Sequence, residues 1–275
     1  VEDPTIIHCN RKKNCGLSIH AKQFAPHLFR DWSSRFPATK EDSKRTAKFY
    51  LKSRGLDTSC FEFEQSLWKE DDWERNTVAF KCDWSGRRWH RLIDPPTGVR
   101  KTRWDSGNGV AYRGYAWMNQ QVDPEVELWV VEGIIEALSL QQGVGIQAAA
   151  TFSSSHVPSI FYESLERNQK IVIALNSDSA GKDGTLKNIQ TLKDLGFSNV
   201  TAAQPLAGMD WNDLLVVGAF KEENQEQTIK DALWHGRLLL ASNFAEYRRV
   251  YEERHGASEK RGLYEGLFKR SRPCL

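Results

Sequence analysis

Short apolar runs alternate with stretches of helical spacing between Val126 and Val217. The apolar runs cover residues 128–131, 146–150, 171–175 and 200–203, and the helical stretches between them cover 134–140, 160–165 and 182–195. Strands that alternate with helices build βαβ units, because parallel neighbours need a long crossover that a helix supplies. We therefore predict an α/β fold with a mostly parallel sheet flanked by helices.

The composition changes on either side of this region. Up to about residue 120 the chain is rich in Trp, Arg, Lys and turn residues and has only short apolar runs, which predicts an α+β subdomain. Residues 222–270 have a helical and heavily charged pattern. A chain of 275 residues, 40% of them hydrophobic, can bury one large core or two moderate ones. We place the domain boundaries at 16–120, 121–218 and 219–275.

Charge and cysteine content exclude several classes of protein. The chain has 38 Lys and Arg against 36 Asp and Glu, so a nucleic-acid site must be a local patch rather than a polycationic surface. No apolar run approaches the ~18 residues of a membrane span, and the N-terminus lacks the apolar stretch of a signal peptide. Five scattered cysteines favour a reducing compartment. We expect a cytoplasmic protein without a membrane partner and, because the first residue is Val, a fragment of a longer one.

Acidic and amide side chains follow the predicted strands, where open α/β sheets gather their functional groups. Glu132 follows the first run, Asn176 and Asp178 follow the third, and Asp210 and Asp213 follow the fourth. Acidic residues also cap helix N-termini, which accounts for any one of these positions without a function. Acids from three loops on one rim suit Mg²⁺ or Mn²⁺, which would bind phosphate oxygens in turn. The pattern favours phosphoryl-transfer chemistry, with capping as the alternative at each position.

A basic stretch runs from residue 81 to residue 113, with eight basic residues against three acidic ones. The aromatic residues interleaved with them are Trp84, Trp89, Trp104 and Tyr112. Arg and Lys neutralise phosphates while exposed rings stack on unpaired bases, which predicts a single-strand or nucleotide groove. The alternative is a small β-sheet whose core the Trp side chains pack, with Arg along its solvated face. The residues we assign to nucleic-acid or nucleotide binding are Arg87, Arg88, Arg91, Arg100, Lys101, Arg103, Arg113 and Lys182.

Three segments share a recognisable order. Residues 130–136 read Val-Val-Glu-Gly-Ile-Ile-Glu, residues 174–181 read Ala-Leu-Asn-Ser-Asp-Ser-Ala-Gly, and residues 210–215 read Asp-Trp-Asn-Asp-Leu-Leu. They resemble the glutamate motif, the Asp-x-Asp-x-Ala-Gly motif and the third acidic segment of Toprim domains, the metal-binding fold of DnaG-type primases, topoisomerases and some nucleases. Upstream, residues 47–56 resemble the start of the DnaG polymerase core, and residues 103–114 resemble the stretch before Toprim in conjugative-plasmid primases, the TraC-like group.

The resemblance implies the catalytic core of a DNA primase, encoded by a plasmid or mobile element. Such a core synthesises short primers on single-stranded DNA from nucleoside triphosphates, with a replicative helicase as a partner in trans or fused. Glu132, Asp178 and Asp210 would be the catalytic residues and would hold one or two Mg²⁺ or Mn²⁺ ions. Glu136 and Asp213 would be outer carboxylates of the same site. Asn176 stands where the family has an aspartate, so it would be a weak ligand and would impair activity.

The resemblance also leaves alternatives open. A Toprim nuclease would use the same metals to activate water, and a Toprim-derived module that has lost catalysis would only bind nucleic acid. No nucleophilic Tyr is supplied by the motifs, which argues against a topoisomerase. Residues 1–15 resemble the second half of a primase zinc ribbon, in which Cys9 and Cys15 would bind zinc only with ligands upstream of Val1.

Overall fold

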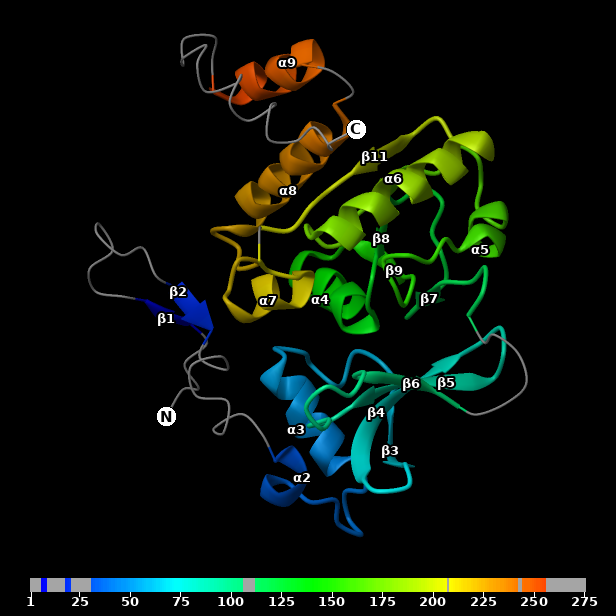
Figure 1. Cartoon of the computed structure of the whole chain (residues 1–275), viewed down its shortest axis with the longest axis vertical. Coiled ribbons are helices and arrows are strands. Elements are labelled where there is room, and N and C mark those ends of the chain that lie inside the picture. The colour runs from blue at the N-terminus through cyan, green and yellow to red at the C-terminus, as the bar shows by residue number, and fades with distance from the viewer. Residues whose placement is uncertain are drawn as a thin grey trace.

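The chain folds around two β-sheets that lie one above the other (Figure 1). The computed structural model describes residues 6–8, 18–20, 31–105, 112–206, 208–241 and 244–255. A short antiparallel pair of strands, β1 (Ile6–His8) and β2 (Ser18–His20), comes before both sheets in the chain. Within the described ranges, no helix is long and apolar enough to span a membrane.

The larger sheet has five strands in the order β11-β10-β8-β9-β7. Four of them are parallel to one another: β8 (Leu128–Val131), β9 (Gln147–Ala150), β10 (Ile171–Ile173) and β11 (Val200–Ala202). The short β7 (Trp117–Met118) runs antiparallel to β9 at the edge. All residues of β8, β9 and β10 are buried, as expected for parallel strands covered on both faces. The predicted α/β fold is confirmed, although β10 ends two residues before its apolar run does.

Helices cover both faces of this sheet. On one face α4 (Ile134–Val144) and α7 (Trp211–Val216) pack together, and the rings of Trp129 and Trp211 meet edge to face at 5.4 Å. On the other face α5 (Ser159–Glu163) and α6 (Ser179–Asp194) bury Tyr162 and Leu192 in a second cluster. The charged C-terminal region forms α8 (Gln225–Leu240), which lies beside β11, and α9 (Phe244–His255), which packs on α8 (Figure 1).

The smaller sheet is antiparallel, with the order β3-β4-β5-β6. Its strands are β3 (Glu64–Lys69), β4 (Glu74–Cys82), β5 (Arg87–Leu92) and β6 (Thr102–Trp104), preceded by α2 (Trp32–Arg35) and α3 (Arg45–Ser53). Phe80 of β4 meets Trp117 of β7 edge to face at 5.7 Å, and one hydrophobic cluster joins the two sheets. The basic stretch therefore packs directly against the parallel sheet.

The basic stretch uses its aromatic residues mainly for packing. Trp89 is only 4% exposed, in the cluster that joins the sheets. Trp104 and Tyr112 stack on each other at 5.3 Å, and both contact Phe152 at the end of β9. Trp84 stacks on Tyr115 at 5.3 Å. The packing alternative holds for these rings.

Gly236 fixes how closely α8 approaches the large sheet. A Cβ atom at this position would lie 2.0 Å from the carbonyl oxygen of Ala202 in β11, a distance that no backbone can accept without moving. Gly236→Ala should therefore lower the free energy of unfolding by about 1–3 kcal/mol. This is the net loss, after the clash has offset the ~1 kcal/mol that Ala gains over Gly inside a helix. Urea denaturation of the full chain measures it.

The matched control is Gln227→Ala on the exposed side of α8, which removes one hydrogen bond to Asp231. This control should change the free energy of unfolding by no more than about 0.5 kcal/mol. An unchanged or higher urea midpoint for Gly236→Ala would contradict the close approach of α8 to β11.

Candidate metal centre

The acidic loops of the large sheet meet at the carboxyl edge of its parallel strands. Glu132 follows β8, Asn176 and Asp178 follow β10, and Asp210 follows β11 at the start of α7. The side-chain amide of Asn176 donates to Glu132 Oε2 at 3.5 Å, which links two of the loops directly. The negative charges of Asp178 and Asp210 both act on Glu132, so the third loop also lies close. The loops that carry these acids therefore lie near one another at this edge.

Asp178 and Asp210 each cap a helix as well. Oδ1 of Asp178 accepts from the backbone N–H of Gly181 at 2.7 Å, and Oδ1 of Asp210 accepts from that of Asp213 at 2.7 Å. Asp213 Oδ2 accepts from the backbone N–H of Asp210 at 3.3 Å, which completes a capping box. Capping and convergence are thus compatible, because the caps hold the two carboxylates in place at the rim.

Gly181 sets the shape of the loop that carries Asn176 and Asp178. A Cβ atom on Gly181 would lie 2.0 Å from the backbone carbonyl oxygen of Asn176, so the first turn of α6 packs against the loop that precedes it. Only glycine allows this approach. This contact gives a physical reason for the Ala-Gly pair at the end of the second motif.

Glu136 is the most deeply buried acid of the group, in the first turn of α4. Burial raises the pKa of Glu136 well above its usual value, and the charges of Asp210 and Glu132 raise it further. Burial, followed by the charge of Asp178, also raises the pKa of Glu132. Each of these carboxyl groups therefore keeps its proton to a higher pH than an exposed carboxyl group does, unless a cation is close by.

Two buried oxygen atoms at this site have no hydrogen-bond partner in the described structure: Glu136 Oε2 and Asn176 Oδ1. Unpaired buried acceptors are unfavourable, and hard oxygen donors of this kind suit Mg²⁺ or Mn²⁺. Within the described ranges, no three His, Cys, Asp or Glu side chains stand close enough to hold an ion together. The residues present therefore fit a divalent cation chemically, but they do not form a closed coordination sphere.

A cavity of about 120 Å³ opens beside these acids. Its lining includes three acids, Glu132, Glu136 and Asp210, and two arginines, Arg54 and Arg91. The Nε atom of Arg54 is buried and unpartnered in the described structure, and Nε of Arg91 donates to the Tyr50 hydroxyl at 3.3 Å. The cavity lining thus contains both carboxylates and arginines, a combination that can hold a metal and a phosphate together.

The structure separates the predicted basic residues into three groups. Arg88 is paired with Glu64 and Asp105 at 2.9 and 3.0 Å, and Arg103 is paired with Glu70 at 3.1 Å. The second group holds the other residues of this stretch that we assigned to nucleic-acid binding: the half-buried Arg87 in β5, Arg100, whose Nε donates to Thr102, Arg91 in the cavity wall, and the exposed Lys101 and Arg113. Lys182 lies in the first turn of α6, outside this cavity.

Arg54 is the functional candidate to which the sequence analysis assigned no role. It ends α3 in the Arg-Gly turn, whose resemblance to the primase core was its one sequence signal. The side-chain amide of Asn212 donates to the Arg54 carbonyl at 2.7 Å and to Ser139 Oγ at 3.0 Å, so α7 fixes the end of α3 beside the acids. Contacts this distant in the sequence leave no local pattern. Cys9 and Cys15 lie outside the described residues, as does the zinc prediction.

Comparison with known protein families identifies one domain in the chain. Residues 127–219 match the Toprim domain family, a range close to the predicted 121–218. No curated protein sequence matches the chain.

The whole chain also resembles solved primase structures. A DNA primase domain from Pseudomonas aeruginosa is 14% identical, with a TM-score of 0.53 over 90% of this chain and 92% of that one. The Escherichia coli primase catalytic core is 16% identical, with a TM-score of 0.53 over 83% and 88%. A DnaG primase catalytic domain bound to single-stranded DNA is 16% identical, with a TM-score of 0.52 over 90% and 93%. Residues 127–219 therefore form a Toprim domain, within a chain that has the fold of DnaG-type primase catalytic cores.

Proposed function

We propose that this chain is the catalytic core of a DNA primase from a plasmid or mobile element, which synthesises short primers on single-stranded DNA from nucleoside triphosphates. The observation that carries the proposal is the cavity that acids from separate strand ends line together with Arg54 and Arg91. The shared fold with primase cores, one of them bound to single-stranded DNA, supports it. A replicative helicase is the partner we expect for such a core.

Glu132, Asp178 and Asp210 would hold one or two Mg²⁺ or Mn²⁺ ions. Such ions, when bound, would neutralise phosphate charge and would lower the pKa of the primer 3′ hydroxyl. The helix caps of Asp178 and Asp210 fix where these two residues stand at the rim. Asp213 positions Asp210 through the capping box. Arg54 and Arg91 would bind and orient the phosphates of the incoming nucleotide.

The buried carboxyl group of Glu136 makes a metal-dependent stability test possible. Its raised pKa means that the folded state keeps the proton to a higher pH than the unfolded state does. Without metal, stability from this group is present at low pH and is lost as the pH rises through the folded-state pKa. Glu136→Gln cannot ionise, so it should unfold at a higher temperature than the wild type, by roughly 2–4 °C for each kcal/mol regained.

The measurement is the unfolding temperature between about pH 5 and about pH 8, once in EDTA and once with Mg²⁺ in excess. Mg²⁺ should stabilise the wild type and reduce or reverse the advantage of the variant, because a bound ion stabilises only the folded state. A variant that is less stable than the wild type in EDTA, with no response of either protein to Mg²⁺, would contradict a metal site at Glu136.

Single-stranded DNA would lie along the exposed cations next to the cavity. Lys101 precedes Thr102, which lines the cavity. Arg113 follows Tyr112, whose ring contacts Phe152 of the cavity wall at 5.9 Å. Both cations are exposed, and neither has an ion pair among the described side chains. Arg88 and Arg103 are less available, because each already pairs with a carboxylate.

Replacing Lys101 and Arg113 together by Gln should weaken single-stranded DNA binding on every sequence tested. The slope of log affinity against log salt should fall by about 1.4, because each phosphate contact on a single strand contributes about 0.7. Fluorescence anisotropy with a labelled oligonucleotide at several salt concentrations measures both. The matched control replaces Lys170 and Lys193, exposed cations before β10 and at the end of α6, and should leave the slope unchanged. Equal slopes for the two double variants would mean that single-stranded DNA does not lie along Lys101 and Arg113.

Asn176 is the departure from the family pattern that decides how active the enzyme is. A neutral amide adds no charge to a metal site, and its Oδ1 is buried without a partner in the described structure. Asn176→Asp places a negative charge there, which should tighten metal binding and raise primer synthesis about 10-fold or more. The assay incubates the protein with single-stranded DNA, labelled nucleoside triphosphates and Mg²⁺ or Mn²⁺, and separates the products by length.

The products also distinguish the functions that the fold allows. New oligonucleotides that increase with Asn176→Asp and disappear with Asp178→Asn support a primase; the Asn keeps the helix cap and removes the charge. Template that is shortened without new oligonucleotides would mean a nuclease. Binding without any product from either the wild type or Asn176→Asp would mean a nucleic-acid-binding module, and the primase proposal would fail.

A further inference from the structure

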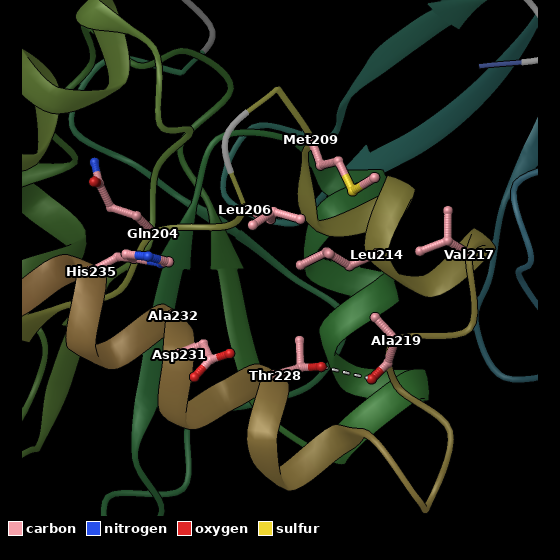
Figure 2. Close-up of a pocket in the computed structure, with 10 residues that line it drawn as sticks. All are labelled: Gln204, Leu206, Met209, Leu214, Val217, Ala219, Thr228, Asp231, Ala232 and His235. Carbon is pink, nitrogen blue, oxygen red and sulfur yellow. Dashed lines mark hydrogen bonds between the residues drawn. The ribbon is translucent and has the colours of Figure 1, made fainter. Parts of the chain in front are cut away.

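Three histidines of the described chain have a pKa that burial lowers: His90, His156 and His235. His235 lines an apolar groove of about 190 Å³ between α7 and α8, whose lining shares no residue with the cavity of the acids (Figure 2). The Nε2 atom of His90 lies 2.7 Å from Oδ1 of Asp105 at the small sheet. His156 differs from both, because its ring connects the loop after β9 to Gly114, directly after the basic stretch.

The ring of His156 joins two backbone segments through its two nitrogen atoms. Nδ1 lies 2.8 Å from the carbonyl oxygen of Thr151, and Nε2 lies 3.1 Å from the backbone nitrogen of Gly114. A carbonyl oxygen can only accept and a backbone N–H can only donate, so Nδ1 must carry the proton and Nε2 must be unprotonated. Burial lowers the pKa of His156 despite the bond to Thr151, and the charge of Lys187 lowers it further, which favours this neutral form.

Gly114 is held through both of its backbone groups. Its N–H donates to His156, and its carbonyl oxygen accepts from the backbone N–H of Phe161 in α5 at 2.8 Å. Its φ of 81° lies in the region that favours glycine, and a Cβ atom there would lie 2.7 Å from the side chain of Ile160. The position of Gly114 against α5 is therefore closely defined.

Arg113 stands between two residues that His156 contacts. On the side opposite Gly114, the ring of Tyr112 meets the His156 ring edge to face at 5.0 Å and stacks on Trp104 at 5.3 Å. The side chain of Arg113 itself is exposed. A cation whose backbone is already fixed loses less conformational freedom when a phosphate binds than a cation on a free loop does.

We propose that His156 is a positioning residue for single-stranded DNA: its neutral ring holds Arg113 where a phosphate of the strand reaches it beside the cavity of the acids. The inference rests on the proposed function, in which Arg113 binds the strand. The loop that His156 holds also carries Phe152 of the cavity wall, and its Ser154 backbone N–H donates to Glu132. One loop therefore links the contact with the strand to the acidic edge of the sheet.

The test is a double-mutant cycle on the affinity of the full chain for a labelled single-stranded oligonucleotide, by fluorescence anisotropy in EDTA. His156→Asn keeps a donor at the level of Nδ1 but has no acceptor that reaches Gly114. It should weaken binding about 3–10-fold, and the slope of log affinity against log salt should fall by about 0.7, the share of one phosphate contact. In an Arg113→Gln background it should change neither, because the contact that it positions is already absent.

Two further variants separate this role from packing. His156→Gln has an amide oxygen at the level of Nε2, so it should recover most of the affinity that His156→Asn loses. The matched control is His235→Asn in the groove of Figure 2, which should leave both the affinity and the salt slope unchanged.

The tautomer of His156 is an independent readout on the wild type, which decides the assignment even if His156→Asn does not fold. Nitrogen NMR of the isotopically labelled chain without DNA should show a protonated Nδ1 and an unprotonated Nε2. The reverse tautomer, or an equal effect of His156→Asn with and without Arg113, would overturn the proposal. DNA binding that depends on Arg113 but not on His156 would remove this proposal alone, whereas a wild type that binds no single-stranded DNA would remove the primase proposal with it.

Discussion

The parallel pairing of β8, β10 and β11 is the constraint on which the candidate site depends. Ile173 of β10 is in register with Val130 on one side and Ala202 on the other, so the three strands end at the same edge. The loops that follow must then bring their acids together, despite the repulsion between like charges. Strand pairing, two helix caps and the contact of Gly181 with the Asn176 carbonyl hold the loops there without help from a metal.

The buried acids of the site are consequently unfavourable to ionise together, and a bound cation would reduce their mutual repulsion. Glu136 is buried with one oxygen unpartnered in the described structure, and its pKa is raised by burial and by its acidic neighbours. Such a group is a poor choice for stability alone, since a hydrogen-bonded or apolar side chain would be more favourable there. Perturbed carboxyl groups in a cavity that also holds Arg54 and Arg91 are typical of sites that bind charged ligands.

The sheet, its helices and the acidic edge could be predicted from the sequence, because local apolar patterns decide where parallel strands begin and end. The role of each basic residue could not. Trp89 is buried and Arg88 is paired because one face of β5 packs towards the large sheet, and the alternating pattern of a strand does not say which partner covers which face. Arg54 was missed for a similar reason, since its surroundings come from α7, far along the chain.

The most direct test of the central claim is Mn²⁺ binding. The claim is that strand pairing brings the side chains of a metal site together. Calorimetric titration of the wild type should be compared with Asp178→Asn and with Asp194→Asn, an exposed acid in the last turn of α6. The Asn at position 178 keeps the helix cap, so a loss of affinity reports the missing charge rather than a damaged fold. We predict that Asp178→Asn binds Mn²⁺ at least ~10-fold more weakly than the wild type, a change of about 1.4 kcal/mol, and that Asp194→Asn binds it equally well. Equal Mn²⁺ affinity for all three proteins would contradict the account.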